Sequence, residues 1–94
     1  MPHLAQLTFP EVDALAAGDV ILVVPLGSTE QHGAHLPLST DTDVARELCE
    51  RLCAARDDVV VAPAVAYGSS GEHAGFAGTL SIGATVLELS LIHI

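Results

Sequence analysis

Two short runs of apolar, mostly β-branched residues dominate the hydrophobic pattern of the chain. The first spans residues 20–25 and the second spans residues 58–63, where three consecutive valines follow an aspartate. Neither run alternates with polar residues, and this is typical of strands that are covered on both faces of a parallel sheet. The pattern therefore predicts two buried strands.

Two stretches with helical spacing accompany these strands. The segment 10–17 begins with Pro10, which suits a first helical turn, and Gly18 lies just past its end. The segment 42–56 is predicted to be a longer helix, because its apolar residues recur on one stripe. That stripe is formed by Val44, Leu48, Leu52 and Ala55.

The order strand, loop, helix, strand predicts a βαβ unit with parallel strands and a right-handed crossover. A Gly- and Ser-rich segment at 67–79 is too irregular for a helix, and another helix is predicted to begin near Ser81. The fold class is thus α/β. Because two strands alone do not make a stable covered parallel sheet, we expect the chain to be the opening portion of a larger domain.

The net charge and the length of the apolar runs indicate which classes of binding partner are disfavoured. Twelve acidic residues against three arginines give a net charge of −9, which disfavours binding to phosphate backbones, so we expect no nucleic-acid partner. No apolar run approaches the ~20 residues that a membrane span needs, and the N-terminus does not resemble a signal peptide. These features predict a soluble, cytoplasmic protein. Cys49 and Cys53, four apart in a predicted helix, are expected to be buried free thiols.

The residues best suited to chemistry lie in the loop after the first strand, GSTEQHGAHLPLSTD at 27–41. Open α/β sheets usually bind ligands at this end of their strands. Glu30 and His32 are two residues apart, so in an extended segment both side chains point to one side. With Asp41 they form a mixed nitrogen and oxygen set that suits Zn²⁺, Mn²⁺ or Fe²⁺. A bridging carboxylate would allow two metal ions, as in hydrolases that activate water.

Other interpretations of the loop remain open from the residues alone. Asp41 precedes a helical stripe and is equally explained as an ordinary helix N-cap. His35 is a candidate third ligand or a group that supports the ligands through hydrogen bonds, and we favour the supporting role. Ser28 and Gln31 have the spacing of a capping box, but Pro37 leaves no helix there to cap.

The second glycine-rich segment, YGSSGEHAGFAGT at 67–79, also has two interpretations. Its glycines are explained by turns alone. Alternatively, a compact loop presents Ser70, Glu72 and His73 to a substrate as a rim of the site.

The two segments together resemble a known family. GSTEQHGAHLPLSTDTDVA closely resembles the first signature of the creatininase family of metal-dependent amidohydrolases, and YGSSGEHAGFAGTLSIG resembles the second. Their order and separation also agree, and the likeness extends from about Thr8 to Glu88. The sequence Phe76-Ala77-Gly78-Thr79 departs from the Phe-Pro-Gly-Thr of many members and is most similar to the mycofactocin-system branch.

This resemblance implies a three-layer creatininase-type fold with a mostly parallel sheet, incomplete here. It implies that Glu30 binds one metal ion, His32 binds the other and Asp41 bridges both, with Ser70 at a substrate-contacting position. The implied reaction is hydrolysis of a C–N amide bond in a small modified peptide, or alternatively in creatinine or a formamide. The complete protein is expected to be a homo-oligomer.

The family's remaining ligands and proton-transfer groups are expected in a later Asn-Gly-His motif, so no catalytic residue is assigned within residues 1–94. These residues are expected to be the N-terminal portion of one creatininase-like domain, in which residues 89–94 depart from the family pattern. On that view the chain alone is inactive. A competing hypothesis is a non-catalytic fragment that acts only by association with another chain.

Overall fold

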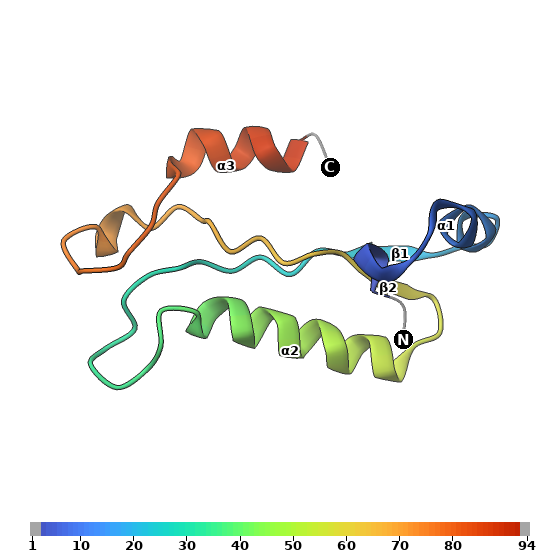
Figure 1. The fold of residues 1–94 in the computed structure, drawn as a ribbon, viewed down its shortest axis with the longest axis horizontal. Helices are drawn as coiled ribbons and strands as arrows, with labels where there is room; N and C mark the ends of the chain where they lie inside the picture. Colours follow the sequence, from blue (N-terminus) through green and yellow to red (C-terminus); the bar gives the residue numbers. More distant parts are fainter. Residues whose placement is uncertain (1–2, 93–94) are drawn as a thin grey trace.

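A computed structural model describes residues 3–92 of the chain (Figure 1). Within these residues, three helices and two strands alternate, with 3₁₀ turns at Leu4–Gln6 and Gly71–His73. The elements are α1 (Phe9–Ala16), β1 (Ile21–Val23), α2 (Thr40–Ala55), β2 (Val59–Val61) and α3 (Gly83–Ile92). In the view of Figure 1, α2 and α3 lie on opposite sides of two long extended segments that continue from the strands.

The sheet has the predicted parallel βαβ connectivity. Strands β1 and β2 pair in parallel, with Ile21 opposite Val59 and Val23 opposite Val61. β1 is shorter than the predicted strand at 20–25, because Pro25 has no N–H to donate to the ladder. The pairing resumes beyond this proline, where the N–H of Gly27 donates to the carbonyl of Val65 over 2.8 Å. The two segments that follow β1 and β2 therefore stay side by side as they leave the sheet.

The core lies between β2 and α2. All three residues of β2 are buried, and Val59 and Val61 pack with Cys49 and Cys53 of α2. Both cysteines are buried free thiols, as predicted. On the other face of the sheet, apolar side chains of α1 lie beside Val60 and β1. The described residues thus form helix, sheet and helix layers.

The expectation that both strands are buried is wrong for β1. Ile21 and Leu22 of β1 are nearly half exposed, and α2 packs over β2 rather than over β1. The apolar stripe of α2 does not face the sheet, since Leu48 is 62% exposed. The helix buries Thr42, Cys49 and Cys53 instead. At ~100° per residue, Val44 lies roughly 200° around the axis from Thr42, so the apolar stripe and the buried face differ.

Helix α1 confirms the predicted helix and begins one residue before Pro10. The backbone N–H and the hydroxyl of Thr8 both donate to Glu11 Oε1, over 3.2 and 2.7 Å. This capping box stabilises the start of the helix. The hydroxyl, and secondarily the backbone N–H, holds the pKa of the Glu11 carboxyl below its usual range.

The capping box makes the stability of α1 dependent on pH. Because the pKa of Glu11 is lowered by folding, its stabilisation is fully present above the unfolded pKa and is lost as the pH falls through the folded pKa. We expect a carboxyl NMR titration to show Glu11 titrating below its ordinary value, and Thr8→Ala to return it toward that value. An unchanged Glu11 pKa in Thr8→Ala would contradict the capping assignment.

The end of the described chain agrees with the predicted helix near Ser81, since α3 runs from Gly83 to Ile92. Of the segment 89–94, residues 93 and 94 lie outside the described residues. None of the helices within residues 3–92 combines the length and hydrophobicity needed to cross a bilayer.

Candidate functional site

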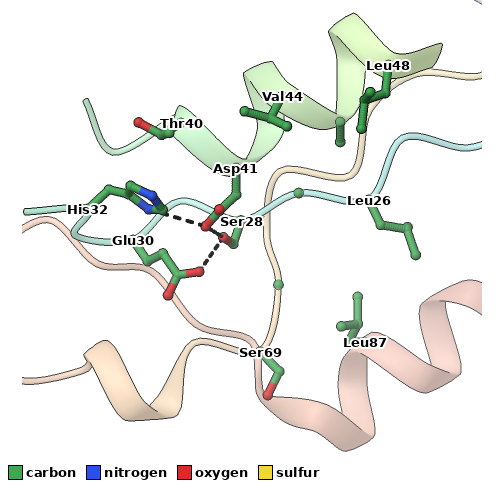
Figure 2. A pocket seen from close by; sticks show the side chains of 13 residues that line it. Leu26, Ser28, Glu30, His32, Thr40, Asp41, Val44, Leu48, Ser69 and Leu87 are labelled. Carbon is green, nitrogen blue, oxygen red and sulfur yellow. Dashed lines mark hydrogen bonds and ion pairs between the residues drawn. The ribbon is translucent and has the colours of Figure 1, made fainter. Parts of the chain in front are cut away.

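The loop after β1, the start of α2 and the second glycine-rich segment enclose an open cleft of about 610 Å³. Figure 2 shows that its polar side chains gather at one end and its apolar side chains at the other. The polar group comprises Ser28, Glu30, His32, Thr40, Asp41 and Ser69, and the apolar group comprises Leu26, Val44, Leu48 and Leu87. The loop therefore places its ligand-type residues beyond the carboxyl end of β1, as expected for an α/β sheet.

Close backbone packing holds the loop against α2. A side chain at Gly27 would overlap the backbone of Thr42, and one at Gly68 would come within 2.9 Å of the Gly27 carbonyl oxygen. The buried hydroxyl of Thr42 donates to the Ser28 carbonyl over 2.9 Å. Glycine at both positions thus lets three segments of the chain meet at the cleft.

Ser28 joins the two carboxylates of the cleft. Its Oγ lies 2.5 Å from Glu30 Oε1 and 2.8 Å from Asp41 Oδ2, although a hydroxyl carries only one hydrogen to donate (Figure 2). The Ser28 hydroxyl is the main cause that lowers the pKa of Asp41, and the nearby His32 adds to it. Asp41 is therefore a carboxylate at neutral pH.

The structure brings the three predicted metal ligands into one cleft. His32 Nδ1 lies 3.8 Å from Asp41 Oδ2, and Glu30 is connected to Asp41 through Ser28. The interpretation of Asp41 as the helix N-cap is wrong. Helix α2 begins at Thr40, two residues earlier than predicted, and its N-cap is Ser39. The Asp41 carboxylate is thereby left to face the loop.

The donor types fit a divalent cation. Two carboxylates and an imidazole are typical ligands of such ions, and no lysine or arginine lines the cleft to neutralise them. The fit is partial, because no three His, Cys, Asp or Glu side chains within residues 3–92 are close enough together to hold a metal ion by themselves. The described residues therefore offer ligands of the right chemistry without a closed coordination shell.

The other predicted site residues lie in different surroundings. His35 is exposed, and its side chain has no hydrogen bond or ion pair within residues 3–92. Ser70 is 1% exposed, and its Oγ has no partner among the described residues. Glu72 is exposed, whereas His73 Nε2 lies 2.8 Å from Glu30 Oε2. The rim is not presented as a unit, and substrate contacts by Ser70 and Glu72 stay predictions.

Sequence reasoning missed two residues that organise the cleft. Ser28 precedes Glu30 by two positions, so the same extended-chain spacing that pairs Glu30 with His32 also places Ser28 on their side. Gln31 Nε2 lies 2.8 Å from His73 Nδ1, a contact between residues 42 positions apart. No local sequence pattern predicts the contact between Gln31 and His73.

Comparison with known proteins extends this picture. A family profile described as creatinine amidohydrolase matches residues 5–94. The chain is 57% identical over 77 residues to the mycofactocin precursor peptide peptidase of Mycolicibacterium smegmatis, and the match covers 77% of this chain and 31% of that protein. It is 46% identical over 101 residues to the protein of the same name from Mycobacterium tuberculosis, covering 98% of this chain and 40% of that protein.

The matched segments thus span 31% and 40% of the length of these relatives. Among solved structures, a creatininase variant described as Zn-Zn type superposes with a TM-score of 0.86 at 32% identity. That superposition covers 95% of this chain and 36% of the creatininase chain. The profile match, the relatives and the shared fold agree, and the chain belongs to the creatininase family.

Proposed function

We propose that the cleft is the metal-binding part of a site that hydrolyses an amide bond in a peptide. The convergence of Glu30, His32 and Asp41 around the end of β1 carries this proposal. In it, the chain is one part of a single creatininase-like domain, and the activity belongs to that domain as a whole.

In this proposal Glu30, His32 and Asp41 hold divalent metal ions, zinc, iron or manganese, with Asp41 shared between two of them. Such ions, when bound, lower the pKa of water and polarise an amide carbonyl. The Ser28 hydroxyl lowers the pKa of Asp41 and so favours the ionised form, which is the form that a metal ion needs. His32 would bind a metal ion through a ring nitrogen lone pair, as metal-binding histidines do.

Identity favours a peptide over creatinine as substrate. The chain is 57% and 46% identical to two proteins named mycofactocin precursor peptide peptidase, against 38% to the creatinine amidohydrolase of Pseudomonas putida. The proposed substrate is therefore a modified peptide related to the mycofactocin precursor.

A chimeric peptidase tests this proposal. In it, the segment of the M. tuberculosis peptidase that matches this chain is replaced by the aligned residues of this chain, which the match covers to 98%. The chimera, loaded with zinc or iron, is expected to cleave the modified precursor peptide. An intact peptide together with hydrolysis of creatinine would overturn the choice of substrate. Loss of both activities in a folded chimera would overturn the proposed function.

A further inference from the structure

A chain of hydrogen bonds connects the two glycine-rich segments at the edge of the cleft. The N–H of Gly33 donates to Gln31 Oε1 over 2.8 Å. Gln31 Nε2 lies 2.8 Å from His73 Nδ1, and His73 Nε2 lies 2.8 Å from Glu30 Oε2. This series of hydrogen bonds ends at the Glu30 carboxylate, which the proposed function assigns to a metal ion.

The groups in this series of hydrogen bonds determine where each hydrogen lies. The backbone N–H of Gly33 can only donate, so the Gln31 side-chain oxygen must face it. The NH₂ group of Gln31 then donates to His73 Nδ1. Nδ1 is consequently an acceptor, so the neutral His73 ring carries its hydrogen on Nε2. That hydrogen points at Glu30, and this is the tautomer needed to donate to a carboxylate.

The two oxygens of Glu30 have polar contacts from different segments, although the single Ser28 hydrogen is shared between Glu30 and Asp41. Ser28 contacts Oε1 from the loop after β1, and His73 contacts Oε2 from the second glycine-rich segment. The Glu30 side chain is only 13% exposed, so water competes weakly for these bonds. Each carboxylate oxygen keeps a further lone pair, which leaves Glu30 able to bind a metal ion while its plane is fixed.

We propose that His73, held in one tautomer by Gln31, is a positioning residue that fixes the orientation of the Glu30 carboxylate for metal binding. This inference rests on the proposed function, since it assigns His73 to the support of a metal ligand rather than to contact with substrate. Partners of metal ligands typically contribute 10- to 100-fold in metal affinity.

NMR of the metal-free chimera with ¹⁵N-labelled histidine tests the hydrogen-bond chain itself. In the neutral form of the His73 ring we expect the hydrogen on Nε2, and Gln31→Leu to abolish this single tautomer. A hydrogen on Nδ1, or a mixture of tautomers in the parent chimera, would overturn the inference whether or not metal binds.

Zinc affinity, measured by competition with a chromophoric chelator, tests the positioning role. His73→Phe is expected to weaken zinc binding by about 10- to 100-fold, and His73→Gln, which keeps an N–H donor, to restore much of it. His3→Phe is the matched control, because His3 also pairs with a glutamate over 2.8 Å but lies away from the cleft. This control is expected to bind zinc as the parent does.

The outcomes separate the two proposals. Zinc binding by His73→Phe as tight as by the parent would overturn the positioning role and leave the proposed function standing. Absence of zinc binding by the parent chimera would overturn the proposed function, while the tautomer measurement still decides whether Gln31 and His73 are connected. If His73→Phe does not fold, His73→Gln and the tautomer of the parent provide the decision.

Discussion

Replacing Asp41 with asparagine is expected to reduce zinc affinity of the chimeric peptidase by more than ~100-fold and to abolish its peptidase activity. Asparagine keeps the shape of the side chain but removes the negative charge that the proposed metal ions share. Because losing a mere partner of a ligand already costs up to ~100-fold, losing a shared ligand should cost more. Chelator competition and elemental analysis of the purified protein measure the effect.

Asp43→Asn provides a matched control in the same helical turn. Asp43 is exposed, accepts a hydrogen bond from Ser39 over 2.8 Å and lies 3.6 Å from Arg46, so it takes no part in the cleft. The substitution removes the same charge from the start of α2, yet we expect it to leave metal content unchanged. Unchanged metal content in Asp41→Asn as well would show that Asp41 is not a ligand.

Gly27→Ala is expected to be the most destabilising single methyl addition at the cleft. The new Cβ would overlap the α-carbon and the side chain of Thr42, which are parts of α2 rather than the end of a flexible side chain. Relief requires the loop to move away from the helix, and this breaks the bond from Thr42 to the Ser28 carbonyl. We expect a loss of about 3 kcal/mol in the free energy of unfolding, at the upper end for overpacking, measured by denaturant titration of the chimera.

Gly71→Ala adds the same methyl group where no atom lies within 4 Å. It is expected to change the free energy of unfolding by less than ~0.5 kcal/mol, as surface substitutions usually do. Equal stabilities of the two variants would contradict the close packing of the loop on α2.

The sequence predicts the elements of the fold well because their signals are local. Three consecutive valines and a run after Gly18 specify the strands, and helical spacing specifies α2 within two residues of its observed start. The buried face of α2 was not predictable in the same way. Thr42 is buried because its hydroxyl bonds to the loop, a tertiary contact that hydrophobicity does not encode.

In the site, too, the features that follow from local spacing were predictable and those that depend on tertiary contacts were not. The spacing of Glu30 and His32 indicates that they share a side of the loop, and the structure places both in the cleft with Asp41. The supporting contact from His73 joins residues 43 positions apart (73 − 30), so only the folded chain reveals it.

Diffraction from crystals of the zinc-loaded chimera, recorded at the zinc absorption edge, tests the central claim most directly. We expect an anomalous peak in the cleft with Glu30, His32 and Asp41 at bonding distance, about 2.0–2.2 Å from zinc. Full zinc occupancy elsewhere in the protein, with these three side chains free of metal, would contradict it.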